Sequence, residues 1–173
     1  MSSTRLSPEK WIDAGFAALC AQGPQALAAE PLARQLGTTK GSFYWHFKDV
    51  PAYHAALLRH WHAKALADVV ERLGDDGPPD ARLRSFGHGI LKNGNEAALR
   101  LWAQSDPIVA ASLAEVDAER TTYINTLLRQ FDLRNPAFGD AVLAALIGLP
   151  QIQAETDTPT AFDALVDTVV ALA

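Results

Sequence analysis

The chain has 173 residues, 49% of them hydrophobic, and a net charge of −5. This composition is too apolar for an intrinsically disordered protein and suffices for one or two folded domains with a core. The acidic balance argues against a protein that binds polyanions over its whole surface. No run approaches the roughly 18 apolar residues of a membrane helix, and residues 1–5 lead into a polar helix start instead of an apolar signal region. We therefore expect a cytoplasmic protein without a membrane segment.

The charge distribution and the cysteine content further restrict the class of protein. Residues 1–50 carry five basic and four acidic side chains, a net charge of +1, which leaves −6 for residues 51–173. Cys20 is the only cysteine, so the chain forms no internal disulfide and no cysteine-cluster metal site. Its place between Leu19 and Ala21 predicts a buried thiol, with a reactive thiol as the alternative. Redox chemistry is therefore not expected.

Capping side chains placed directly before prolines mark helix starts along the chain, because the side chain bonds free N–H groups and proline at the first helical position loses no bond. These pairs are Ser7-Pro8, Asp106-Pro107, Asn135-Pro136 and Thr158-Pro159. Between them apolar residues recur with a helical period, beginning with the stripe of Ile12, Phe16 and Leu19, and no hairpin turn separates alternating runs. The sequence predicts an all-α fold of about nine helices.

Two short helices are predicted close together before residue 50. Gly37 suits the position just after a helix end, and a further helix runs from about Thr39 to Phe47. Only residues 37–39 lie between the two helices. Two short helices joined by a three-residue turn that contains glycine form a helix-turn-helix arrangement.

The second of these helices carries a dense run of aromatic residues. Phe43 and Phe47 lie four residues apart and therefore face the same way. We expect them to anchor the helix on Ile12, Phe16 and Leu32. Trp45 then points in nearly the opposite direction. The outward face and its flanks carry Lys40, Gly41, Ser42, Trp45 and His46, with Thr39 as the N-terminal cap.

This outward face suits contact with DNA. The hydroxyl, indole and imidazole groups of Tyr44, Trp45 and His46 are placed for the major groove, and Gly41 lets the backbone come close. In the alternative interpretation the aromatic side chains pack within the protein and a neighbour covers Trp45. Lysine and serine side chains surround Trp45, and these polar groups favour phosphates and base edges as its partners.

Residues 32–48, LARQLGTTKGSFYWHFK, resemble the DNA-binding motif of the tetracycline-repressor-like (TetR) family of transcriptional regulators, and residues 12–23 resemble that family's first helix. The resemblance is specific over about residues 8–60; beyond them, helix number, helix length and the stretch 102–128 are similar. It implies a homodimeric repressor whose C-terminal domain binds a small molecule and thereby releases a palindromic operator. It also implies phosphate contacts by Tyr44 and Lys48, and base or backbone contacts by Thr39, Lys40, Ser42, Trp45 and His46.

Three positions depart from the family's pattern. Ala28 stands where a threonine or serine cap is usual, and Glu30 and a proline follow it. Val50 replaces a usual lysine, and Thr38 replaces a usual valine. Each lost phosphate contact makes the salt dependence shallower by about one unit of log affinity per log salt. We therefore expect the fold to be retained and the DNA affinity to be reduced.

A long helix is predicted over residues 49–73, about 35 Å at 1.5 Å per residue. It would connect a DNA-binding domain at residues 1–50 to a ligand-binding and dimerisation domain at residues 51–173, and would transmit movement between them. The three histidines of this helix lack the spacing of metal ligands. We therefore expect no metal site and no cofactor.

Several side chains of the larger part are candidates for lining an apolar cavity between helices. They are Trp61, Phe86, Trp102, Tyr123, Phe138, Ile147, Gln151 and Gln153. Core packing alone explains any one of them, and the expectation of a pocket comes from the family resemblance. Residues 148–150, Gly-Leu-Pro, should interrupt the penultimate helix because the proline lacks an N–H donor.

The last helix has a wide apolar stripe and only two charged side chains. The stripe consists of Phe162, Leu165, Val166, Val169 and Val170. Such a helix needs partners on two sides, and pairing with residues 141–149 and their symmetry mates would form a four-helix dimer interface. Two-fold symmetry would place the DNA-contacting helices roughly 34 Å apart, on the half-sites of an inverted repeat. The alternative is an internal helix of a monomer.

No nucleophile elbow, phosphate loop, zinc-protease pattern or dinucleotide-binding turn occurs, so we expect a protein that is not an enzyme. The leading hypothesis is a ligand-responsive repressor that binds double-stranded DNA as a homodimer and is released by an unidentified small molecule. One alternative is a small-molecule-binding bundle whose helix-turn-helix contacts proteins or is vestigial. A third possibility is DNA binding without a ligand. High alanine, leucine and arginine usage is typical of a GC-rich bacterial genome.

Overall fold

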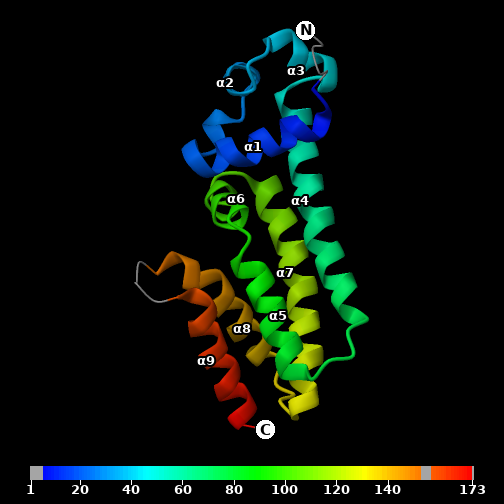
Figure 1. The fold of residues 1–173 in the computed structure, drawn as a ribbon, viewed down its shortest axis with the longest axis vertical. Helices are drawn as coiled ribbons and strands as arrows, with labels where there is room; N and C mark the ends of the chain where they lie inside the picture. The colour runs from blue at the N-terminus through cyan, green and yellow to red at the C-terminus, as the bar shows by residue number, and fades with distance from the viewer. Residues whose placement is uncertain (1–5, 153–156, 173) are drawn as a thin grey trace.

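The computed structural model describes residues 6–152 and 157–172, and within them it contains nine α-helices and three short 3₁₀ segments with no β-strand (Figure 1). The α-helices are α1 (Pro8–Gln22), α2 (Ala29–Gln35), α3 (Lys40–His46), α4 (Val50–Leu73), α5 (Pro79–Leu91), α6 (Asn95–Ala103), α7 (Pro107–Leu128), α8 (Ala137–Gly148) and α9 (Thr158–Ala171). The 3₁₀ segments are η1 (Pro24–Ala26), η2 (Arg129–Phe131) and η3 (Leu149–Gln151). The predicted all-α class is confirmed. No helix of the described ranges is long and apolar enough to cross a membrane.

Each of the four predicted capping pairs lies within one residue of a helix start, and Asp49 caps a further helix, α4. Asp49 accepts a hydrogen bond of 2.7 Å from the third residue of α4, and Asp106 accepts one of 2.9 Å from the second residue of α7. Asn135 accepts one of 3.1 Å from the first residue of α8. Ser7 holds the cap position of α1 without a side-chain bond. Thr158 was predicted as a cap and is instead the first residue of α9, so the start lies one residue earlier than expected.

The helices form an elongated molecule with α1–α3 at one end (Figure 1). The long helices α4 and α7 pack side by side and lead away from that end. α6 packs on both α1 and α7, α8 packs on α7, and α9 packs on α5. The predicted interruption after α8 is confirmed, because η3 begins immediately where α8 ends at Gly148.

Two hydrophobic cores follow each other along the molecule. The first joins α1–α3 to the first part of α4, and it also includes Leu99 and Trp102 of α6 and Val109 of α7. The second joins α5, the later part of α7, α8 and α9 around Phe86, Tyr123 and other apolar side chains. The division of the chain after residue 50 stays a prediction. α6 shares its core with the N-terminal helices, so a displacement of α6 would reach them directly.

Candidate functional site

α2 and α3 are joined by the tight turn that the sequence predicts. Gly37 has φ +63°, a left-handed conformation that glycine adopts without a steric penalty. The N–H of Thr38 donates to the carbonyl of Ala33 at 2.9 Å, which closes the end of α2. Thr39 then caps α3, because its hydroxyl oxygen accepts a hydrogen bond from the N–H of Ser42 at 3.3 Å. The turn therefore fixes where α3 begins.

Buried aromatic rings hold α3 in place. Phe43 is fully buried, and its ring centroid lies 5.4 Å from that of Trp11 and 5.2 Å from that of Tyr53. Phe47 packs edge-on against Tyr53 at 4.9 Å. The predicted anchors belong to the same core, but Trp11 and Tyr53 were missed. Tyr53 lies four residues before Leu57 on the buried stripe of α4, and that spacing was the available signal.

The opposite face of α3 is exposed. The side chain of Trp45 is 69% exposed and that of Tyr44 is 46% exposed, so both present a large surface to solvent. A surface hollow of about 270 Å³ is lined by Thr39, Gly41, Ser42, Trp45 and His46. Five of the eight predicted DNA-contacting residues therefore share one surface.

The remaining three predicted residues, Lys40, Tyr44 and Lys48, lie on α3 or just beyond its end and do not line this hollow. Lys40 is exposed and lies with its ammonium 5.9 Å from the ring centroid of Tyr44, a cation–π arrangement that supports both side chains. Lys48 is exposed just beyond the end of α3. Two lysines thus border a polar and aromatic surface, as contact with a phosphate backbone requires.

The start of α2 differs from that of α3. Ala28 holds the cap position of α2 and its side chain makes no hydrogen bond. Arg34 pairs with Glu30 at 3.3 Å, and both side chains are largely exposed. The glutamate therefore neutralises the basic side chain of α2 in part, although an exposed pair of this kind contributes little to stability.

The sequence of this N-terminal region identifies its family. Residues 12–49 match the sequence model of the bacterial regulatory proteins of the tetR family, and they include α2, the turn, α3 and its capping residues. This match places the N-terminal region in the tetR family. None of the curated protein sequences matches the chain.

Solved structures show that the fold extends over the whole chain. A transcriptional regulator from Rhodococcus sp. Rha1 is 20% identical with a TM-score of 0.76, covering 96% of this chain and 97% of that one. A TetR-family transcriptional regulator from Streptomyces coelicolor is 17% identical with a TM-score of 0.74, covering 95% and 89%. A transcriptional regulator from Aquifex aeolicus VF5 is 16% identical with a TM-score of 0.74, covering 96% and 99%. At these identities the likeness concerns the fold.

The predicted cavity residues within the described ranges are spread over several places in the structure. Phe86 and Tyr123 pack against each other in the second core with ring centroids 4.8 Å apart, and Trp102 packs edge-on against His54 at 5.0 Å. Trp61 borders a hollow of about 360 Å³ beside α4. Phe138 is 39% exposed on α8, and Gln153 lies outside the described residues. Core packing, the alternative weighed for each position, describes Phe86 and Tyr123.

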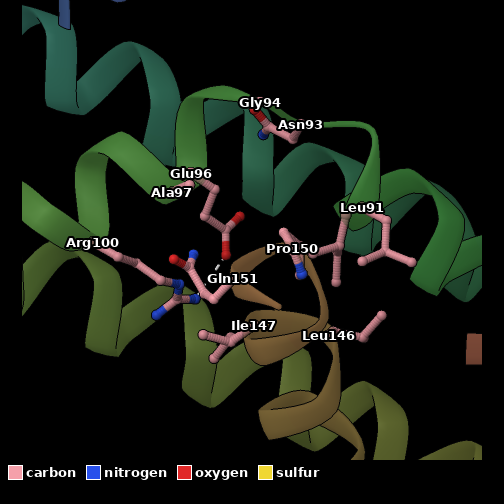
Figure 2. Close-up of a pocket in the computed structure, with 11 residues that line it drawn as sticks. Leu91, Asn93, Gly94, Glu96, Ala97, Arg100, Leu146, Ile147, Pro150 and Gln151 are labelled. Carbon is pink, nitrogen blue, oxygen red and sulfur yellow. Dashed lines mark hydrogen bonds and ion pairs between the residues drawn. The ribbon is translucent and has the colours of Figure 1, made fainter. Parts of the chain in front are cut away.

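Ile147 and Gln151 line a different cavity, of about 70 Å³, between α5, α6, α8 and η3 (Figure 2). Its apolar walls are Ile90, Leu91, Ala97, Leu146, Ile147 and Pro150. Its polar lining is formed by Asn93, Glu96, Arg100 and Gln151. In Figure 2 the carboxylate of Glu96 points from α6 into the space between that helix and η3.

Glu96 belongs to a buried ion network between α6 and α7 that the sequence analysis missed. One oxygen of its carboxylate, Oε1, accepts hydrogen bonds of 2.7 Å from both Arg100 and Arg120. Arg100 also donates to both oxygens of Asp117, at 2.8 and 2.9 Å. Residues 96 and 100 are an i,i+4 pair and residues 117 and 120 an i,i+3 pair, which was the only sequence signal.

Burial and ion pairing have opposite effects on the pKa values of Glu96 and Arg100. Burial by itself raises the pKa of Glu96, but the hydrogen bonds and charges of Arg120 and Arg100 outweigh it, so the pKa lies below its ordinary value. Burial likewise acts to lower the pKa of Arg100, and the hydrogen bonds and charges of Asp117 and Glu96 raise it above its ordinary value. Both groups therefore favour their charged forms at neutral pH.

The predicted burial of Cys20 is wrong. Its side chain is exposed, because it follows Leu19 on the other side of α1. The thiol faces the α5–α6 connection, with Sγ 3.4 Å from Oδ1 of Asn95 and 3.7 Å from the carbonyl oxygen of Gly94. Partial burial raises the pKa of the thiol, which keeps it protonated and weakly reactive.

Proposed function

We propose that this TetR-family chain is a dimeric transcriptional repressor that binds an inverted-repeat operator and is released by a small molecule. The observation that carries the proposal is the division of α3 into two faces. Phe43 is fully buried on one face while Trp45 is 69% exposed on the other. A helix so firmly anchored holds its exposed polar and aromatic side chains rigidly, which suits contact with a DNA groove.

Each group of that face has a proposed role. Tyr44 and Lys48 contact phosphates, since Tyr44 is exposed on α3 and Lys48 is exposed just beyond its end. Trp45 and His46 contact base edges or the sugar-phosphate backbone in the major groove. The remaining contacts are made by Thr39, Lys40, Gly41 and Ser42. Ala28 gives α2 no side-chain cap, which supports the expectation that α2 contributes little to the affinity for DNA phosphates.

We place the dimer interface on α8 and α9. Each packs on the body of the chain by one face, α8 on α7 and α9 on α5, and leaves another face exposed. On α8 the exposed side chains include Ala137, Phe138, Ala141 and Ala144, and on α9 they include Ala164 and Val170, with Leu172 just after the helix. Small and apolar side chains let the helices of two subunits approach closely in a four-helix bundle.

The cavity beside α6 is the proposed effector site. Glu96 and Arg100 line it, while Leu99 and Trp102, on the same helix, lie in the core shared with α1 and α3. A ligand that fits better to a displaced α6 would shift the population toward a form in which the two α3 helices no longer match the operator. We therefore propose α6 as the element that couples ligand to DNA.

Selection of bound sequences from random duplex DNA, at low and moderate salt, tests the proposal. A dimeric DNA-binding protein enriches an inverted repeat whose half-sites are about one helical turn apart. Salt-sensitive binding without enrichment, or no binding, would contradict the proposal and favour the small-molecule-binding bundle.

A further inference from the structure

Two buried polar atoms of the ion network have no hydrogen-bond partner among the described residues. Oε2 of Glu96 and Nε of Arg100 are buried and have no hydrogen-bond partner in residues 6–152 and 157–172. The Glu96 side chain is 8% exposed, and both residues line the cavity between α5, α6, α8 and η3 (Figure 2). A buried polar atom without a partner is costly, so this cavity favours a molecule that supplies both bonds.

The two atoms need opposite hydrogen-bonding partners, one a donor and the other an acceptor. An ionised carboxylate oxygen only accepts hydrogen bonds, and a guanidinium N–H only donates them. The pKa of Glu96 lies below its ordinary value, because the pairing with Arg120 and Arg100 outweighs burial. The matching head group therefore carries both a donor and an acceptor, as a primary amide or a hydroxyl does.

The balanced charge of the network disfavours an ionic head group. The carboxylates of Glu96 and Asp117 balance the guanidinium groups of Arg100 and Arg120 through direct bonds of 2.7 to 2.9 Å. A ligand carboxylate or ammonium group would enter this buried site without a counter-charge and would lose its hydration. The site therefore favours a neutral molecule.

The size and the apolar walls of the cavity indicate which ligand body fits beside the polar head group. The volume is about 70 Å³, and six of the eleven lining residues are apolar. A cavity of about 150 Å³ holds benzene in another protein, so this one suits a body of about three to five non-hydrogen atoms. The apolar walls favour an aliphatic body.

We propose that this cavity binds a small neutral amide or alcohol, with its polar head on Glu96 and Arg100 and its aliphatic body against Ile147 and Leu146. The inference rests on the proposed ligand-responsive function and names the chemical class of the effector. Glu96 is the specificity-determining residue, because its unpartnered oxygen selects a donor.

Ligand-observed NMR titration of the purified full chain with propionamide, propionate and propylammonium tests the inference. The three probes have similar aliphatic bodies and differ in head-group charge. We expect saturable binding of propionamide with a Kd of about 1 mM, as is typical for a molecule of this size, and at least about tenfold weaker binding of both ions. Equal affinity for propionate, or no saturable binding of propionamide, would overturn the inference.

Three variants test whether propionamide binds in this cavity. Glu96→Gln removes the acceptor charge and leaves the network with a net positive charge, so propionamide should bind about tenfold more weakly and propionate more tightly than to the unmodified chain. Ile147→Trp fills the cavity and leaves the ion network intact, so every probe should lose binding even if Glu96→Gln does not fold. Glu119→Gln changes an exposed glutamate of α7 and should leave each Kd unchanged. Undiminished propionamide binding in Ile147→Trp would overturn the assignment to this cavity.

The DNA selection separates this inference from the proposed function. An enriched inverted repeat without propionamide binding would overturn the ligand class and leave the repressor proposal in place. Propionamide binding that follows the variant pattern, without any enriched DNA sequence, would support the cavity chemistry and contradict the repressor proposal.

Discussion

The hydroxyl of Tyr53 donates a 2.8 Å hydrogen bond to the backbone carbonyl of Trp11 and so ties α4 to α1. Tyr53 is fully buried, and burial raises the pKa of its hydroxyl, which keeps the donor protonated. The same ring contacts Phe43 and Phe47. The position of α3 therefore depends on how α1 and α4 cross.

Gly15→Ala should disturb that crossing. A Cβ atom at Gly15 would lie 1.9 Å from the hydroxyl oxygen of Tyr53 and 2.6 Å from Cδ1 of Leu57, so one of the helices must move. We expect the free energy of unfolding in urea to fall by about 1–3 kcal/mol. Gly41→Ala is the matched control, because its Cβ would meet only the Thr39 hydroxyl at 3.7 Å and alanine favours the helix. Equal stability of Gly15→Ala and the unmodified chain would contradict the crossing geometry.

Ala28→Ser should stabilise the chain. Ala28 has an extended backbone at the cap position of α2, with φ −117° and ψ 154°, and its side chain leaves the first N–H groups of the helix without a bond. A serine hydroxyl supplies that bond, and the free energy of unfolding should rise by about 0.5–2 kcal/mol. Ala17→Ser, on the exposed face of α1, is the control and should show no gain. Equal effects of both serines would argue against the uncapped helix start.

The contribution of Glu96 to stability should depend on pH. Its pKa is lower in the folded chain than the ordinary value of 4.5, because Arg120 and Arg100 outweigh the effect of burial. The ionised group therefore stabilises the fold above about pH 4.5, and this stabilisation is lost as the pH falls through the lower folded pKa. Glu96→Gln should cost about 3 kcal/mol at pH 7 and progressively less below pH 4.5, measured by urea unfolding across the range. A pH-independent difference would show that the charge of Glu96 is not what stabilises the network.

Ala144→Arg should dissociate the proposed dimer. Ala144 is exposed on α8, where an arginine would place charge and bulk between the helices of two subunits. Light scattering should report a dimer for the unmodified chain and for the control Ala67→Arg, exposed on α4, and a monomer for Ala144→Arg. A dimer in all three proteins would place the interface elsewhere.

Local patterns predicted the helix-turn-helix, while contacts between distant residues escaped prediction. The spacing of Phe43 and Phe47 and the glycine at position 37 lie within one short segment, so their consequences follow from helix geometry. The ion network joins Glu96 to Arg120 across two helices, and only their packing brings the charges together. Cys20 shows the limit of local reasoning, because an apolar neighbour in sequence can lie on the other side of a helix.

The predicted cavity residues show the same limit. Phe86 and Trp102 are large and apolar, as cavity residues often are, and they are equally suited to filling a core. Which of them borders empty space depends on how far α5, α6 and α8 stand apart, and that distance is set by many side chains together. Ile147, near the end of α8, and Gln151, in η3, both line the cavity, although they lie in different elements.

The affinity of Trp45→Ala for the selected inverted repeat is the most direct test of the exposed α3 face. We predict at least about a tenfold loss for Trp45→Ala. Lys48→Ala should in addition reduce the slope of log affinity against log salt by about one unit, because it removes one phosphate contact. Val70→Ala, which truncates a 65% exposed side chain on α4, should bind as the unmodified chain does. Unchanged affinity in Trp45→Ala and Lys48→Ala would contradict the assignment of this face to DNA.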